Sequence, residues 1–533
     1  MRAAAIRGAL GLALAALLAG AAGADPAPAV RIGEGLVRGA DVDGLRVFKG
    51  IPYAAPPVGE RRWRAPAPPA AWSNERDATA FGPDCIQTRP AWDPTQSKRS
   101  ISEDCLTLNL WAPTSAGGPS PVMVWIHGGG FTLGSGSQPI FDGAALARRG
   151  VIVVTFNYRL GRFGFFAHPA LSAEAAAANE PTGDFALMDQ IAALRWVRRN
   201  ISAFGGDPAS VTVFGESAGG GSVEQLMLIE PARGLFARAI SQSGGGRDDW
   251  PLLATDLPGK PSAETIGKAF AAKAGIAGDG PQALTALRAL PAARVLDSLD
   301  MLHAEPDTYS GPMIDGRLVV GRVDQGFAAG KAAPTTLLIG ANSNELGFIP
   351  ALFRGPINAK AAELLGADAA AVKAAYGSGA AYGAHLASDV TFVEPARFLA
   401  SQITAHGGHA WLYSFGYVPT AKRGHQDGAP HASDLAFVFG NLGALDVAAT
   451  PDDAREARLI GDYWVAFAKT GDPNGDGRPA WPGMSAGNGP RLDFTDTDTG
   501  AAAARFDSTA LDAIAAHFTH AAGSTRDDHG GRP

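Results

Sequence analysis

The sequence predicts an α/β fold, with a large, mostly parallel central sheet flanked by helices and helical insertions that roof a pocket. Two observations predict it. Short apolar runs rich in β-branched residues recur along the chain, and helical patterns lie between them. Strands of a parallel sheet are buried on both faces, so they are apolar without alternation. The runs are PVMVWIHG (121–128), VIVVTFNY (151–158), SVTVFGES (210–217), ARAISQSG (237–244), TTLLIGAN (335–342) and AWLYSFGY (410–417).

A long helix is expected between the second and third runs. Leu187, Ile191 and Leu194 recur there at helical spacing. The segments 255–310 and 350–400 are rich in alanine and helical in pattern, which predicts the insertions. Active sites of such folds lie at the carboxyl ends of the strands. The residues that follow each apolar run are therefore the first candidates for function.

Length and charge narrow the functional class. The chain has 533 residues, 46% hydrophobic and 18% charged, which is an ordinary globular composition. Its net charge is -7, with no block of like charges, whereas a nucleic-acid partner requires a basic face. We therefore expect no nucleic-acid partner. No window of eighteen apolar residues follows the N-terminal segment, so we expect no transmembrane span. The sequence does not define the oligomeric state.

The N-terminus has the pattern of a secretory signal peptide. Two arginines flank the start of an apolar stretch that ends in Ala22-Gly23-Ala24. We predict cleavage after Ala24, a single domain over residues 25–520 and a flexible tail over 521–533. A membrane-anchor helix is the alternative for residues 1–24. Export would place the protein in the periplasm or outside the cell.

Cys85 and Cys105 are the only cysteines of the chain. In an exported protein, two cysteines twenty positions apart predict one disulfide that closes a loop. Loop-closure entropy gives such a bridge a stabilisation of about 3 kcal/mol. Two unpaired buried thiols are the alternative. Neither cysteine is a candidate nucleophile, because no histidine accompanies it.

The pentapeptide GESAG, residues 215–219, directly follows the third apolar run and predicts a nucleophile at Ser217. In Gly-x-Ser-x-Gly, the serine occupies a strained turn between a strand and a helix, and its small neighbours let the backbone approach closely. A glycine-rich helix cap is the alternative from the pentapeptide alone. A phosphate-binding loop would need Gly-Lys-Ser/Thr, and no lysine is present here.

A serine nucleophile also needs donors for the oxyanion that develops on the substrate. The stretch HGGGF, residues 127–131, follows the first apolar run and is typical of the glycine-rich oxyanion loops of esterases. Glycines leave backbone amides uncovered, and each lost donor typically lowers the rate by about 10²–10³-fold. We expect the donors to be the amides of Gly129, Gly130 and Ala218. A purely structural glycine turn is the alternative.

The acid that orients the base should follow the serine in the chain. Glu345 lies a few residues past the end of the strand predicted at 335–340, where such a carboxylate is expected. Asp315 is the rival, but it belongs to an Asp-Gly pair that is typical of a tight turn. Glu345 is therefore the favoured acid.

The base is expected further downstream. His431 follows the predicted strand 410–417 and precedes an apolar run, whereas its rival, His425, lies in a charged loop. His406 and His409 form a His-x-x-His pair, but no third ligand lies nearby, so we expect no metal site. His431 is the favoured base.

These motifs together resemble the type-B carboxylesterase/lipase family of α/β-hydrolases, which also contains the cholinesterases. The resemblance spans roughly residues 30 to 500 and follows the family's order. The motifs that support it are FKGIPYAAPPVGERRWRAP, SEDCLTLNLWAP, VWIHGGGF, NYRLGRFGFF, FGGDPASVTVFGESAGG, SQSG, GPMIDG, GANSNELGF, GAPHASDLAFVFG and YWVAFAKTGDPN.

The resemblance implies the α/β-hydrolase fold and a role for each candidate. The implied roles are nucleophile for Ser217, acid for Glu345, base for His431, and oxyanion donors for Gly129, Gly130 and Ala218. Cys85 and Cys105 match the family's first disulfide, while its other bridges have no cysteines here. Glu216 and Ser243 match positions beside the active site and are candidates for supporting roles. Asp184 and Asp434 depart from the family's usual residues, which leaves their roles open.

The expected function is hydrolysis of a small-molecule carboxylic ester through an acyl-enzyme on Ser217, with no metal or organic cofactor. A serine peptidase or amidase on the same fold is the alternative enzyme. A catalytically inactive adhesion protein is the alternative binding protein, but the intact serine, glutamate and histidine disfavour it. Aromatic residues make up only 8% of the chain and Trp92 lacks the spacing of a choline-binding residue, which disfavours a cholinesterase. The acyl and alcohol groups of the ester are not defined by the sequence.

Overall fold

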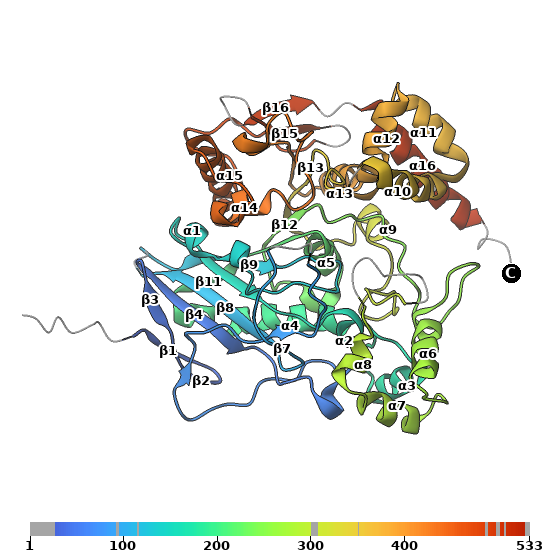
Figure 1. The fold of residues 1–533 in the computed structure, drawn as a ribbon. Coiled ribbons are helices and arrows are strands. Elements are labelled where there is room, and N and C mark those ends of the chain that lie inside the picture. The colour runs from blue at the N-terminus through green and yellow to red at the C-terminus, as the bar shows by residue number, and fades with distance from the viewer. Residues whose placement is uncertain are drawn as a thin grey trace, which may run out of the picture.

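An eleven-stranded sheet forms the centre of the computed structural model (Figure 1). The structure describes residues 27–527, apart from residues 92–94, 115–116, 300–307, 350, 486–488, 497–500 and 506–507. The predicted signal peptide therefore lies outside the described residues, and so does Trp92.

The strands of the sheet run in the order β16-β15-β14-β13-β12-β11-β9-β10-β8-β4-β3. The six predicted strands are confirmed as β9 to β14, and every pair from β10 to β15 is parallel. Strands β8, β4 and β3 at one edge and β16 at the other pair in antiparallel fashion and were not predicted. The strands are β3 (Ala40–Val42), β4 (Leu45–Pro52), β8 (Thr107–Pro113), β9 (Ser120–Ile126), β10 (Ile152–Phe156), β11 (Gly206–Glu216), β12 (Arg238–Gln242), β13 (Thr336–Asn342), β14 (Ala410–Phe415), β15 (Pro490–Phe494) and β16 (Ala501–Arg505).

Both faces of the sheet are buried, as the continuous apolar runs predict. In β9, Val122 and Val124 belong to one hydrophobic cluster, while Met123 and Trp125 belong to a second cluster on the opposite face. Successive side chains of a strand point to opposite faces, so a strand covered on both sides has no polar positions to alternate. Helices that contribute to the first cluster include α4 (Phe185–Asn200), α5 (Ala218–Leu226) and α13 (Glu394–Ala405), and helices that contribute to the second include α14 (Leu435–Val438) and α15 (Pro451–Thr470).

The helix predicted between the second and third runs is α4. Leu187, Ile191 and Leu194 are all buried in it, which confirms the helical spacing. Both alanine-rich segments are also helical, as predicted. The first contains α6 (Ala263–Lys273), α7 (Pro281–Arg288) and α8 (Ala292–Leu296), and the second contains α10 (Ala351–Leu365), α11 (Ala369–Ala375) and α12 (Gly379–Ser388).

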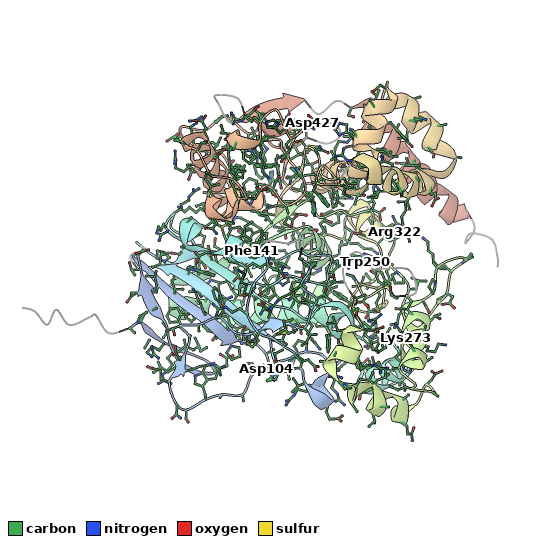
Figure 2. The ribbon with its side chains drawn as sticks, in the orientation of Figure 1. Asp104, Phe141, Trp250, Lys273, Arg322 and Asp427 are labelled. Atoms are coloured by element: carbon green, nitrogen blue, oxygen red, sulfur yellow. A yellow bond between two sulfur atoms is a disulfide. The ribbon has the colours of Figure 1, made fainter. Side chains whose placement is uncertain are left out.

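The two insertions occupy different parts of the molecule. Figure 1 shows α6, α7 and α8 near α3 (Pro169–Ala178), whereas α10, α11 and α12 gather with the C-terminal helix α16 (Thr509–Asp527). In Figure 2, Lys273 marks the first group, and Arg322, the residue before α9 (Val323–Ala328), lies between the two groups. Helix α16 extends into the segment 521–533 that the sequence predicts as a tail. Among the described helices, none has the length and apolar composition needed to cross a membrane.

Candidate active site

Ser217 lies on the predicted turn between strand β11 and helix α5. Its backbone has φ 56° and ψ -125°, a region that costs a non-glycine residue about 1–3 kcal/mol. The two flanking glycines make this turn possible. A Cβ atom at Gly215 would collide with the backbone of Gly219, and one at Gly219 would collide with the backbone of Ile126. The hydrogen bond from the amide of Ser217 to the carbonyl oxygen of Gln242, at 2.9 Å, anchors the turn to β12.

The segment His127–Phe131, here called the glycine loop, follows β9 and lies against this turn. A Cβ atom at Gly128 would lie 2.7 Å from the carbonyl oxygen of Glu216 and 3.0 Å from Cβ of Ser217. Gly129 and Gly130 have φ values of 104° and 58°, which favour glycine. No described residue accepts a hydrogen bond from the amides of Gly129 and Gly130. These amides are therefore available to a ligand beside Ser217.

Glu345 and His431 meet at the carboxyl ends of the neighbouring strands β13 and β14. The Nδ1 atom of His431 lies 2.6 Å from Oε2 of Glu345. A carboxylate only accepts hydrogen bonds, so Nδ1 is the donor and Nε2 remains for another partner. The amide of His431 also donates to the carbonyl oxygen of Glu345, at 3.0 Å. The imidazole is thus fixed by both the side chain and the backbone of Glu345.

Two further donors fix the carboxylate of Glu345. Its Oε1 atom accepts a hydrogen bond from Oγ of Ser243 at 2.7 Å and one from the amide of Asn342 at 2.6 Å. Glu345 and Ser243 are both fully buried. The structure therefore brings Ser243 to Glu345 rather than to Ser217.

Glu216 approaches the other side of the imidazole. Its Oε1 atom lies 3.2 Å from Nε2 of His431. Burial raises the pKa of Glu216 to about 8, although His431 opposes this rise. Burial disfavours the charged form of His431, but the carboxylates of Glu216 and Glu345 outweigh it and raise the pKa of His431 to about 9. The side chain of His431 is 19% exposed, so a ligand can reach it from solvent.

This arrangement occurs in a chain most of whose length matches one family. The sequence profile of the Carboxylesterase family matches residues 26–376 and 380–511. The chain belongs to the carboxylesterase family. This membership confirms the resemblance found in the sequence, and the chain is a carboxylic ester hydrolase that acts on small-molecule substrates.

Relatives of this carboxylesterase include bacterial enzymes named for two different esters. It is 40% identical to the para-nitrobenzyl esterase of Bacillus subtilis (strain 168) over 83% of this chain and 89% of that protein. It is 36% identical to the fumonisin B1 esterase of Sphingopyxis macrogoltabida over 84% of this chain and 83% of that protein. Among solved structures, a thermophilic PNB esterase has a TM-score of 0.80 at 34% identity, covering 91% of this chain and 99% of its own. This neighbour supports the α/β-hydrolase fold.

Asp434, whose role the sequence leaves open, takes part in a buried polar chain behind the site of this carboxylesterase. Nε2 of Gln242 donates to Oδ2 of Asp434 at 2.6 Å, and Nε1 of Trp464 donates to Oε1 of Gln242 at 3.1 Å. Burial raises the pKa of Asp434 to about 6. The backbone carbonyl of Gln242 also accepts the hydrogen bond from the amide of Ser217. Gln242 therefore links the Ser217 turn to the His431 loop. Sequence reasoning missed Gln242 and Trp464.

One aromatic contact of His431 was also missed. A π-helical turn, Asp389–Val393, places the ring of Phe392 4.9 Å from the imidazole of His431, tilted by 34°. The turn lies directly before α13 in the second alanine-rich segment. This insertion therefore contributes a side chain to the site.

The rival residues lie in other environments. His425, His406 and His409 are all exposed. Asp315 lies in a turn, where its Oδ1 atom accepts hydrogen bonds from three backbone amides, those of residues 317, 318 and 319. Asp184 precedes α4 and accepts a hydrogen bond from the amide of Met313 at 3.0 Å, while burial and Asp315 raise its pKa. Asp315 thus holds the backbone of its own turn, whereas Asp184 holds the amide of a residue 129 positions away.

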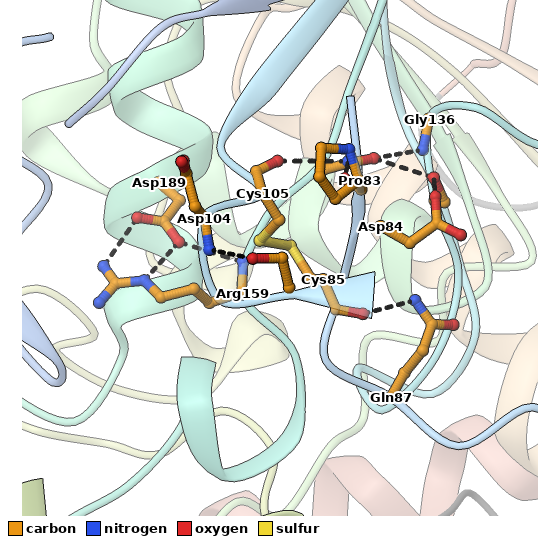
Figure 3. Close-up of a disulfide and its surroundings, with 12 residues drawn as sticks. Pro83, Asp84, Cys85, Gln87, Asp104, Cys105, Gly136, Arg159 and Asp189 are labelled. Carbon is orange, nitrogen blue, oxygen red and sulfur yellow. Dashed lines mark hydrogen bonds and ion pairs between the residues drawn. A yellow bond between two sulfur atoms is a disulfide. The ribbon is translucent and has the colours of Figure 1, made fainter. Parts of the chain in front are cut away.

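The predicted disulfide between Cys85 and Cys105 is confirmed (Figure 3). Both cysteines are buried, and they line a small cavity together with Arg159. The guanidinium of Arg159 makes two hydrogen bonds of 2.7 Å to the carboxylate of Asp189 on α4. The disulfide, which belongs to the first hydrophobic cluster, thus closes the 85–105 loop beside a buried ion pair.

Proposed function

We propose that this carboxylesterase works through an acyl-enzyme on Ser217, with His431 as the base and Glu345 as the acid that orients it. The observation that supports the proposal most is the position of the imidazole. Its Nδ1 atom is held by Glu345, and its Nε2 atom is turned toward Glu216, the residue next to Ser217. An imidazole held in this way presents Nε2 as a general base.

In the first half of the proposed reaction, Oγ of Ser217 attacks the carbonyl carbon of the ester, and its proton passes to Nε2 of His431. The carbonyl oxygen becomes an oxyanion, which accepts hydrogen bonds from the amides of Gly129, Gly130 and Ala218. As the bond to the alcohol oxygen breaks, His431 returns the proton to that oxygen. The alcohol leaves and the acyl group stays on Ser217.

In the second half, water attacks the acyl carbon and gives a proton to His431. The bond between the acyl carbon and Oγ of Ser217 then breaks, and His431 returns the proton to Oγ. The products are one carboxylic acid and one alcohol, and the enzyme is restored. Glu345 keeps its proton count throughout, because it stabilises the imidazolium without accepting its proton.

Replacement of Ser217 tests the nucleophile. Ser217→Ala should lower ester turnover by about 10⁶-fold, as the removal of a triad serine does elsewhere. An organophosphate should label the wild-type chain once, at Ser217, and mass spectrometry of the digested protein locates the label. Near-normal turnover by Ser217→Ala would falsify the assignment.

His431 has a matched control in His425, which lies six positions earlier and is exposed. His431→Ala should abolish turnover and prevent organophosphate labelling, because Ser217 then has no base. His425→Ala should leave both unchanged. The assignment is wrong if the two variants behave alike.

The substrate class can be narrowed with a small panel. A nitrobenzyl ester is the first choice, since a relative with 40% identity is a para-nitrobenzyl esterase. Nitrophenyl esters of increasing acyl length then report the size of the acyl site, and matched nitroanilides test the peptidase or amidase alternative. We expect turnover of esters and none of the matched amides.

We also propose that the protein is exported, with cleavage after Ala24. The support is the charged and apolar pattern of residues 1–24 and the disulfide, which persists in oxidising compartments. N-terminal sequencing of the protein recovered from the periplasmic fraction and from the culture medium tests this. A mature chain that still begins at Met1 would contradict it.

A further inference from the structure

The glycine loop rests on a buried aromatic pair that its own motif does not include. The ring of Tyr158, two residues after β10, stacks on the imidazole of His127 with centroids 4.3 Å apart and planes inclined by 15°. The hydroxyl of Tyr158 donates a hydrogen bond to the carbonyl oxygen of His127 at 2.7 Å. Both side chains are buried. Burial and the carboxylate of Glu216 raise the pKa of Tyr158, so its hydroxyl keeps the proton that it donates.

The imidazole of His127, held by Tyr158, in turn holds the next peptide group, that between Gly128 and Gly129. Burial lowers the pKa of His127 to about 4, so its ring is neutral at working pH. The Nδ1 atom lies 2.9 Å from the carbonyl oxygen of Gly128, which only accepts hydrogen bonds, so Nδ1 holds the single ring proton. No described residue makes a hydrogen bond with Nε2. Among the described residues, the carbonyl of Gly128 in the glycine loop is therefore the one hydrogen-bond partner of the imidazole.

These two hydrogen bonds fix the directions of two amides. In a planar trans peptide group, the C=O and the following N–H point in opposite directions. When Tyr158 holds the carbonyl of His127, it also orients the amide of Gly128. When His127 holds the carbonyl of Gly128, it orients the amide of Gly129, which is one of the proposed oxyanion donors.

The glycines need such external anchors. Glycine gains no direction from a side chain and readily adopts several backbone conformations, so three glycines in sequence would sample many orientations of their amides. A donor displaced by about 1 Å can cost about 10²-fold in rate. The close approach of Gly128 to Ser217 leaves little room for compensation.

We propose that Tyr158 is a positioning residue for the oxyanion donors: it holds His127, and His127 holds the peptide group that directs the amide of Gly129 toward the substrate. This inference rests on the proposed acyl-enzyme function. It predicts that loss of the Tyr158 hydroxyl weakens the stabilisation of the transition state more than the binding of the substrate.

The test is Tyr158→Phe, which removes the hydroxyl and keeps the ring. We expect kcat to fall about tenfold with KM within twofold, because the donors remain but are less well directed. The affinity for a trifluoromethyl ketone, which forms an oxyanion on the serine, should fall by about the same factor as kcat/KM.

Tyr463→Phe is the matched control. Tyr463, on α15, is also buried, and its hydroxyl donates to a backbone carbonyl oxygen, that of Pro479, at 2.5 Å, away from the glycine loop and from Tyr158. Both variants lose one hydrogen bond of the same kind, so both should lose a similar amount in melting temperature. Only Tyr158→Phe should show a lower kcat and a lower affinity for the trifluoromethyl ketone. Equal kcat values for the two variants, or a change in KM alone, would overturn the proposal.

A second pair keeps the test decisive if Tyr158→Phe does not fold. His127→Asn retains an amide donor near the position of Nδ1, whereas His127→Leu removes it. The Asn variant should keep more of kcat than the Leu variant, and equal values overturn the inference. Ser217→Ala separates this result from the proposed function: an active Ser217→Ala refutes the acyl-enzyme, whereas an inactive Ser217→Ala with a fully active Tyr158→Phe refutes only the role of Tyr158.

Discussion

The Nε2 atom of His431 lies 3.2 Å from the Oε1 atom of Glu216, on the side of the imidazole opposite to Glu345. Two carboxylates therefore flank one ring, and a third, Asp434, is close enough to influence both the ring and Glu216. This concentration of negative charge retains protons in the resting site. A general base has to be neutral before it can accept the proton of Ser217.

The first prediction concerns the pH dependence of kcat/KM. A neutral His431 becomes available as pH rises through its pKa of about 9, so kcat/KM should rise with pH well beyond the ordinary range of histidine. Glu216→Gln removes the carboxylate beside Nε2 and should move the acidic limb to lower pH. A profile of kcat/KM between pH 5 and 10, measured on a neutral ester, checks the shift.

Glu456→Gln is the control for this profile. Glu456 is also buried with a raised pKa of about 8, but the charges that influence it are those of Arg455 and Arg423. Its replacement should leave the acidic limb in place. If the acidic limb of the Glu216→Gln profile stays in place, or moves to higher pH, the electrostatic role of Glu216 is contradicted.

The second prediction concerns the support of Glu345. Ser243→Ala removes one of the two donors to its Oε1 atom and leaves the amide of Asn342. A hydrogen bond to a charged group contributes about 1.5–3 kcal/mol, so kcat should fall about tenfold or more. Steady-state kinetics on one ester should show this loss with little change in KM.

Ser241→Ala is the matched control for that variant. Ser241 lies two residues earlier in β12, is equally buried, and donates to a different carboxylate, Oε1 of Glu224, at 2.7 Å. Its kcat should stay within about twofold of wild type. If both serine variants lose activity equally, the effect comes from the strand and not from Glu345.

The sequence predicts those parts of the site that a local pattern records. Ser217 and the glycine loop lie in short motifs directly after apolar strands, and Glu345 follows β13 within three residues of its end. Parallel strands bring these ends together, so proximity follows from topology. The six strands β9 to β14 were predictable for the same reason, since burial on both faces leaves continuous apolar runs.

The remainder depends on contacts that no local pattern records. Gln242 contacts Asp434 and Trp464, which are 192 and 222 positions away, and a glutamine at the end of an apolar strand gives no signal by itself. Tyr158 is similar, because its partner belongs to another strand end. Strand β4, which lies next to the edge strand β3, was missed for a different reason: it contains the partly exposed Arg46 and Lys49, so it lacks the continuous apolar character of β9.

The third prediction concerns the disulfide. The double variant Cys85→Ala/Cys105→Ala should lose about 3 kcal/mol of unfolding free energy, because the unfolded chain regains the freedom of a loop of about twenty residues. Urea unfolding without reductant measures the loss. Wild-type protein unfolded with reductant should approach the variant. Equal stability of the variant and the oxidised wild type contradicts the prediction.

The fourth prediction concerns Glu224, a buried carboxyl group on α5 whose Oε2 atom makes no hydrogen bond to the described residues. Burial raises its pKa from 4.5 to about 8. Between these values the folded chain holds a proton that the unfolded chain releases, so unfolding free energy falls as pH rises, by up to about 1.4 kcal/mol per pH unit. Glu224→Gln cannot ionise, so it should become progressively more stable than wild type between pH 5 and 8.5, as measured by urea unfolding.

Glu394 shows why burial alone does not produce this result. It is as buried as Glu224, but Arg247 donates two hydrogen bonds to its carboxylate, at 2.7 and 3.0 Å. Glu394→Gln removes one of the two carboxylates paired with the buried guanidinium of Arg247 and leaves Asp324, at 3.4 Å. It should therefore lose about 1.5–3 kcal/mol of unfolding free energy, and it should remain less stable than wild type from pH 5 to 8.5. The two variants make the same chemical change and differ only in whether a cation faces the carboxylate. A stability difference for Glu224→Gln that does not grow with pH would show that Glu224 is already ionised in the folded protein.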